Sequence, residues 1–195
     1  MKLFKKKKDV KSWKDITLEQ GIELSQLDIE DSWELITNQM AIILDTTMDE
    51  IEKKPAALVY EFINDWAFIK ALPPMKELKH FKVDGQWYKL CNLSEMTLAQ
   101  MVDIEEYYKL GLMNNVHKIL SVLYLPAKKD ILGRWTLSEY QPDEGRENIF
   151  LKMDMESIYG TVLFFWNIVQ NYMKGLKDYL KMEEMKMMSM NKVEE

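Results

Sequence analysis

The longest apolar run in this sequence is Ile158-Tyr159-Gly160-Thr161-Val162-Leu163-Phe164-Phe165-Trp166-Asn167-Ile168-Val169. Its side chains are too large and too apolar to face water, and the run is shorter than the roughly 20 residues that a membrane helix requires. We predict a long helix from about Lys152 to Met190. Its first half, residues 158–169, is expected to complete the core of the domain.

The second half of that predicted helix is rich in methionine. Methionine packs adaptably and suits surfaces that accept partners. We therefore take four methionines as candidate partner-binding residues: Met173, Met182, Met185 and Met188. A helix-prone tail without a partner is the alternative. The predicted organisation is a basic N-terminal arm (1–15), a helical domain (16–170) and a projecting Met-rich helical tail (171–195).

Helix signals recur upstream of the apolar run. Thr17 with Gln20, and Thr47 with Glu50, have capping-box spacing, and Asp31 precedes an apolar pattern of helical period. Pro55 suits the start of a broad apolar helix, which Pro73-Pro74 ends. Two more helices are expected. In the first, after Ser94 or Thr97, one face is lined by Leu98, Met101, Ile104 and Tyr108; the second begins at Asn114 or Asn115 and stops before Pro126.

One β signal lies between these helices. Asp84-Gly85 is flanked by alternating apolar and polar residues, which favours a two-residue hairpin near residues 80–90. Residues 127–148 are largely polar and are predicted to form the longest loop. The predicted fold class is mainly α: a helical domain with one small β-hairpin and a long C-terminal helix.

Charge is unevenly distributed along the 195 residues. The net charge is −6, yet residues 1–14 carry seven lysines against one aspartate, or +6, which leaves −12 for the rest. An acidic body does not suit a general nucleic-acid binder, so we expect nucleic-acid contact only through the arm residues Lys5, Lys6, Lys7 and Lys8. An acidic protein face, anionic lipid or plain solvation of the arm are the alternatives.

Targeting and redox signals are few. No apolar stretch follows the basic N-terminus, so we expect neither a secretory signal nor a membrane protein. Cys91 is the single cysteine, which rules out an intramolecular disulfide and fits a reducing compartment.

Catalytic and metal signatures are missing from the sequence. There are two histidines, the spacing Glu77-x-x-His80 occurs once, and Cys91 has no second sulfur ligand. There is no Gly-x-Ser-x-Gly elbow and no glycine-rich phosphate loop. We expect no enzyme activity, cofactor or metal.

Tryptophans outside the predicted core helices are the other candidate partner contacts. Trp13 lies in the arm and Trp135 in the predicted loop. Each either folds back on the domain or anchors another protein, as buried aromatic residues do at interfaces.

Residues 90–107 resemble small α-helical proteins of tailed bacteriophages. Those proteins show a strand followed by the pattern LT-x-x-Q-x-x-D-x-E; here Met96 replaces the leucine, while Thr97, Gln100, Asp103 and Glu105 match. Residues 119–126 and 158–169 resemble the later helices of the same proteins, so the resemblance spans roughly residues 85–170. It implies a phage morphogenesis protein without catalytic residues, for which crass-like phages, with packaged cargo and ring proteins, are one setting.

The resulting functional expectation is a non-enzymatic virion component, structural or packaged as cargo. It would act through contacts with other phage virion proteins, in multiple copies, within a virion assembled in the host cytoplasm. A tail assembly chaperone that is absent from the mature virion is the alternative, and a small enzyme is the third hypothesis.

Overall fold

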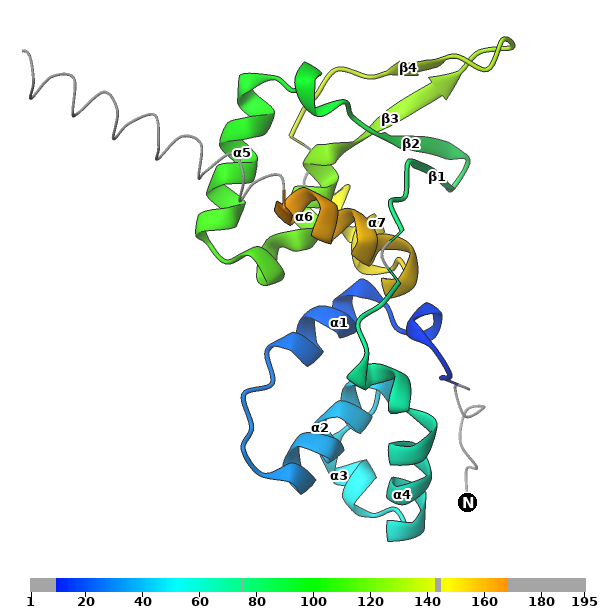
Figure 1. Cartoon of the computed structure of the whole chain (residues 1–195), viewed down its shortest axis with the longest axis vertical. Helices are drawn as coiled ribbons and strands as arrows, with labels where there is room; N and C mark the ends of the chain where they lie inside the picture. The colour runs from blue at the N-terminus through cyan, green and yellow to red at the C-terminus, as the bar shows by residue number, and fades with distance from the viewer. Residues whose placement is uncertain (1–9, 75, 143–144, 168–195) are drawn as a thin grey trace, which may run out of the picture.

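The computed structural model describes residues 10–74, 76–142 and 145–167, and it has two parts (Figure 1). The lower part in that view is helical, and the upper part combines a sheet with helices. In chain order the elements are η1 (Trp13–Asp15), α1 (Leu18–Ser25), α2 (Ser32–Leu44), α3 (Met48–Glu52), α4 (Ala56–Asp65), η2 (Ala67–Lys70), β1 (His80–Val83), β2 (Gln86–Leu90), η3 (Leu93–Glu95), α5 (Leu98–Lys109), α6 (Leu112–Leu123), β3 (Tyr124–Lys129), β4 (Trp135–Leu137) and α7 (Glu147–Leu151). Residues 155–167 are also helical, and we call them the closing helix.

The helix starts predicted at Thr17, Asp31, Thr47 and Thr97 are confirmed, whereas the helix predicted to begin at Asn114 or Asn115 begins earlier, as α6 at Leu112. The Thr17 hydroxyl accepts a hydrogen bond from the Gln20 amide, and the Asp31 carboxylate accepts from the amides of Trp33 and Glu34. Thr47 and Thr97 cap α3 and α5 in the same way. Such caps satisfy amides that have no partner within the helix, and so fix its first turn. The helix predicted after Pro55 is shorter than expected, because α4 ends at Asp65 and a 3-10 turn, η2, follows.

The helical half, residues 32–70, is held by apolar side chains. Those most deeply buried along α2, α3 and α4 are Met40, Ile43, Ile51, Val59, Phe62 and Trp66. Phe62 and Trp66 lie one turn apart, with ring centroids 4.4 Å apart.

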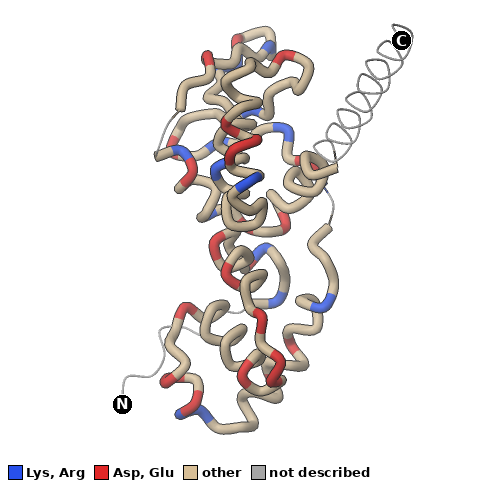
Figure 2. Tube along the Cα trace, turned by 90° about the vertical axis from the view of Figure 1, so that its left-hand side faces the viewer, with Lys and Arg blue, Asp and Glu red and all other residues tan. Residues whose placement is uncertain are grey.

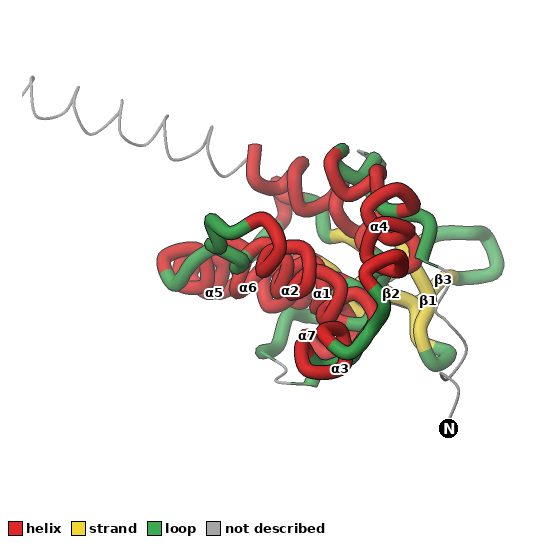
Figure 3. The backbone as a smooth tube through the Cα atoms, turned by 90° about the horizontal axis from the view of Figure 1, so that it is seen from below, coloured by secondary structure: helices red, strands yellow, loops and turns green. Residues whose placement is uncertain are grey.

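The sheet is antiparallel, with strand order β1-β2-β3-β4. The predicted hairpin is confirmed as β1 and β2, and Asp84 and Gly85 both have positive φ, 48° and 82°, as its tight turn requires. Tyr88 of β2 pairs with Pro126 of β3, and Ala127 of β3 pairs with Leu137 of β4. Figure 3 shows the strands to one side of helices α5 and α6.

The predicted fold class is wrong: the protein is a mixed α/β structure with a four-stranded sheet. β3 begins at the residue after α6 ends, and β4 lies inside the segment predicted to be a loop. The cause is long-range pairing, since β3 and β4 are short and are specified by β2 and by each other more than by their own sequences. The same pairing places Trp135 in a strand.

The closing helix completes the core of this sheet half, residues 76–167. Ile158, Val162 and Phe165 are buried on one side of it, so the prediction for the first part of the apolar run is confirmed. The helix starts at residue 155, after α7 and a break, and not at Lys152. The predicted extension over residues 168–190 lies outside the described residues.

The segment that includes η1 and α1 joins the two halves. The Leu18 amide donates to Met153 O (2.8 Å), and the Met155 amide donates to Ile16 O (2.9 Å). At the other side of α1, the Gln20 side-chain amide donates to Ile42 O (2.8 Å) at the end of α2. Among the described residues, none of the helices has the length and apolar character that crossing a membrane demands.

Candidate docking site

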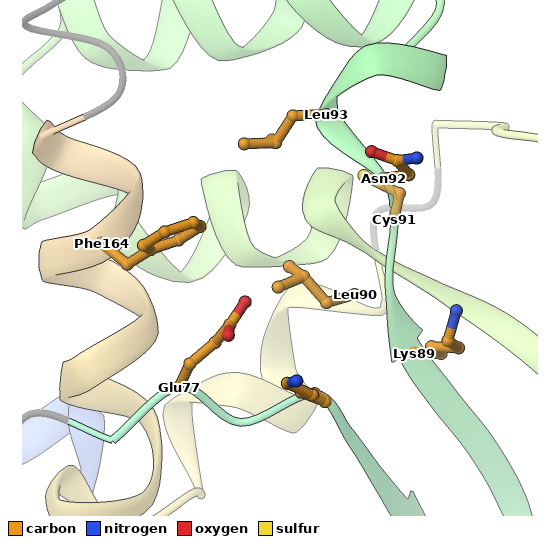
Figure 4. A pocket seen from close by; sticks show the side chains of 8 residues that line it. Glu77, Lys89, Leu90, Cys91, Asn92, Leu93 and Phe164 are labelled. Atoms are coloured by element: carbon orange, nitrogen blue, oxygen red, sulfur yellow. The ribbon is translucent and has the colours of Figure 1, made fainter.

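An open pocket of about 310 Å³ lies between the closing helix, the end of β2 and the segment before β1. Its apolar lining consists of Leu90, Cys91, Leu93 and Phe164. Its polar lining consists of Glu77, Lys79, Lys89 and Asn92. Figure 4 shows Phe164, Leu93 and Leu90 pointing toward the same space from three different elements. The site is therefore an apolar floor with a charged rim.

Backbone hydrogen bonds hold the sheet side of this pocket. The Leu90 amide donates to Lys79 O (3.0 Å), and the Cys91 amide donates to Leu123 O (2.9 Å). Asn92 then caps η3 through its side chain, which accepts from the Ser94 amide. These bonds turn the chain sharply after β2 and direct Leu93 back over the floor.

The closing helix is fixed against the opposite wall by buried and partly buried polar contacts. The Thr161 hydroxyl accepts from the Leu78 amide at 3.0 Å and contacts the Tyr124 hydroxyl, which also donates to Leu78 O. Burial raises the pKa of Tyr124 far above its ordinary value, so the phenol stays protonated as a donor. Gly160 permits this close approach, because a Cβ there would overlap the backbone of Lys76.

Several large apolar side chains of the sheet half are exposed to solvent. Phe164 is 43% exposed, and on α5 Leu98 and Val102 are 78% and 52% exposed. Leu98 and Val102 are one turn apart and project away from the buried side of α5, which carries Gln100 and Ile104. Of the four residues predicted to line one face of this helix, Ile104 is buried, Tyr108 is half-buried, and Leu98 and Met101 are exposed.

A second exposed apolar feature is the turn between β3 and β4, where Ile131 and Leu132 face solvent. Asp130 organises this turn, because its carboxylate accepts from the amides of Arg134 and Leu132 and from the Arg134 guanidinium. The backbone amide of Arg134 is the main reason why the pKa of Asp130 is lowered. The turn is therefore ordered while it presents two large apolar side chains.

Cys91 is the one thiol of the pocket lining. Cys91 is buried, and desolvation raises the pKa of its thiol, which disfavours the nucleophilic thiolate. The Gln100 side-chain amide lies 3.9 Å from its sulfur. Within the described ranges no group of three or more His, Cys, Asp or Glu side chains could hold a metal ion.

The structure locates only two of the candidate partner-binding residues. Trp13 is half-buried against Phe68, with ring centroids 5.6 Å apart, and its indole N–H donates to Ala71 O (3.0 Å). Trp135 is half-buried in β4. The methionines Met173, Met182, Met185 and Met188, and the lysines Lys5 to Lys8, lie outside the described residues.

Sequence reasoning missed the pocket. Its lining comes from three separated segments, so no local pattern marks it. The one available signal was Phe164, because a helix that buries Ile158, Val162 and Phe165 on one side must direct Phe164 elsewhere.

Comparisons with known proteins add no relative: no protein-family model, curated protein or solved structure matches this chain.

Proposed function

We propose that the protein is a non-enzymatic component of a tailed-phage particle that works by contacts with other virion proteins. The observation that supports this proposal best is the pocket with its apolar floor, at whose edge Phe164 is exposed. The resemblance of residues 85–170 to phage proteins supplies the setting. The Met-rich segment remains a predicted second contact.

The pocket fits a large apolar side chain of a partner protein. Its volume of about 310 Å³ exceeds that of one Leu, Met or Phe side chain, and Leu90, Leu93 and Phe164 offer apolar contacts to it. Filling such a site contributes about 1.5–3 kcal/mol for one side chain. Pockets of this kind hold the anchor residues that dominate protein interfaces.

The charged rim defines the partner further. The charged residues of the lining are Glu77, Lys79 and Lys89, so the rim carries both signs. A partner that flanks its apolar anchor with an acidic and a basic residue would match it. Charges at the edge of an interface contribute more to specificity and orientation than to affinity.

Mass spectrometry of purified particles tests this function. We expect the protein in stoichiometric amounts in mature virions. Presence during assembly followed by absence from the mature virion would overturn the proposal in favour of a tail assembly chaperone.

A charge placed in the pocket tests the site. Phe164→Glu should lower incorporation into particles at least tenfold, because a carboxylate would have to be desolvated on docking. The matched control is Leu72→Glu, at a 69% exposed position just after the helical half, which should incorporate normally. Equal incorporation of both variants would contradict the assignment of the pocket.

A further inference from the structure

One face of the sheet carries two tryptophans that do not belong to the core. Side chains alternate across a strand, so Phe81 and Tyr88 share the face that packs on Tyr124. Lys82 and Trp87 pair on the opposite face, and Lys129 pairs with Trp135 on that same face. Neither Trp87 nor Trp135 packs against the core cluster. We call His80, Lys82, Trp87, Lys129 and Trp135 the tryptophan face.

The rings of this face form one continuous group. Ring centroids are 5.4 Å apart for Trp87 and Trp135, 5.0 Å for His80 and Trp135, and 5.8 Å for His80 and Trp87. Two lysines cover the ring faces, with Lys82 Nζ 5.5 Å from the Trp87 centroid and Lys129 Nζ 5.2 Å from that of Trp135. An ammonium over a partly exposed ring is a weak contact, so a flat ligand can displace it.

The sheet segments are basic, although the chain after the N-terminal arm is acidic as a whole. Residues 76–90 and 124–137 together carry seven basic and three acidic side chains, a net charge of +4. Residues 15–74 carry three basic and thirteen acidic side chains, a net charge of −10. Figure 2 shows Asp and Glu distributed along the helices. A polyanion would be attracted to the sheet and repelled from the helical half.

We infer that the tryptophan face binds single-stranded nucleic acid. Unpaired bases stack on aromatic rings, while neighbouring lysines pair with the phosphates. When a base stacks on Trp87 or Trp135, the displaced ammonium of Lys82 or Lys129 is already beside the backbone it can neutralise. A duplex offers no unstacked bases, and the carboxylate side chains of an acidic peptide offer no flat rings. This site shares no residue with the pocket lining, although His80 pairs with Lys89 of that lining, and it does not depend on the proposed virion role.

Fluorescence anisotropy with a labelled oligothymidylate of about 16 nucleotides tests the inference on the full chain. We expect binding that weakens as salt rises. Lys82→Gln with Lys129→Gln should reduce the slope of log K against log salt by about 1.4, since each phosphate contact on a single strand contributes about 0.7. The matched control, Lys53→Gln with Lys70→Gln on the helical half, should leave the slope unchanged.

A second variant tests stacking. Trp87→Ala with Trp135→Ala should lower affinity at least tenfold, and the quenching of indole fluorescence by the wild-type complex should shrink. If the double tryptophan variant does not fold, the double lysine variant still tests the inference, because Lys82 and Lys129 are exposed on their strands.

The N-terminal lysines require a separate variant. Substituting Lys5 to Lys8 by Gln should weaken binding by a salt-dependent amount but leave the indole quenching in place. The inference is overturned if the arm variant loses all binding while the sheet variants bind like wild type. Tighter binding to a duplex of the same length, or to vesicles containing anionic lipid, would also overturn it.

Discussion

The helical half and the sheet half of this protein are stabilised in different ways. In the helical half, residues 32–70, short helices close in sequence bury apolar side chains only, among the described residues. All four buried polar residues of the described chain lie in the sheet half: Gln100, Asn115, Arg146 and Thr161. Three of them bind segments distant in sequence: Gln100 to Val122 O, Arg146 to Ser121 O and Thr161 to the Leu78 amide. Buried polar groups must be satisfied, so they constrain the sheet half to one arrangement.

The contrast extends to one shared motif. Thr17-Leu18-Glu19-Gln20 and Thr97-Leu98-Ala99-Gln100 both begin a helix with a capping box. In each, the glutamine side chain also donates to a carbonyl near the end of another helix, Ile42 O for Gln20 and Val122 O for Gln100. Gln100 is 2% exposed, whereas Gln20 is only partly buried. The same local motif therefore forms a partly exposed contact between helices at Gln20 and a buried one at Gln100.

The largest expected effect comes from removing a buried aromatic ring from the core of the sheet half. Phe150 is fully buried, with its ring centroid 5.7 Å from Phe81 and 5.6 Å from Tyr124. Phe150→Ala should lower the free energy of unfolding by about 4–5 kcal/mol, measured by urea denaturation. Phe62→Ala, in the helical half, should cost about 3 kcal/mol. A larger loss for Phe62 would break the contrast between the halves.

Two glycines test how closely the closing helix is packed. Gly160→Ala forces a Cβ onto the backbone of Lys76 and should cost about 2–3 kcal/mol despite the better helix propensity of alanine. Gly21→Ala meets only the flexible side chain of Met155, so about 1 kcal/mol or less is expected. Thermal unfolding measures the loss of stability in each variant. Equal losses would show that the backbone beside Gly160 shifts to accept the added methyl group.

The shared glutamine motif predicts an unequal pair of intermediate effects. Gln100→Ala removes part of a capping box and leaves Val122 O buried without its donor, for a loss of about 2 kcal/mol. In Gln20→Ala, the partly exposed Ile42 carbonyl can accept a hydrogen bond from water instead, so we expect a loss of only about 1 kcal/mol in the free energy of unfolding. Denaturation midpoints of the two variants give the comparison, which fails if Gln20 is the costlier site.

The smallest effect concerns pH. His117 is half-buried on α6, and desolvation lowers its pKa below the ordinary 6.5, with Glu147 and Glu19 acting in the opposite direction and Lys118 adding to it. The unfolded chain therefore takes up this proton at a higher pH than the folded protein, and stability should fall as pH drops below 6.5. His117→Gln should reduce that fall in melting temperature, while the control His80→Gln should retain it. An unchanged pH profile in His117→Gln would refute the assignment.

Local patterns predicted the parts of the fold that are determined locally. Capping at Thr17, Asp31 and Thr97, and the Asp84-Gly85 turn, depend on residues within a few positions of one another. β3 and β4 could not be predicted in the same way, because Tyr124 continues the apolar pattern of α6 and becomes a strand residue only by pairing with Leu90. The pocket and the tryptophan face depend on that missed pairing, since β2 borders both.

Cross-linking mass spectrometry of purified virions tests the claim that the sheet half carries the contacts. Lys79 and Lys89 line the pocket, whereas Lys53 and Lys70 lie on the helical half. We predict that cross-links to other virion proteins concentrate on Lys79 and Lys89. Cross-links concentrated on Lys53 and Lys70, or none from this protein to any virion protein, would contradict it.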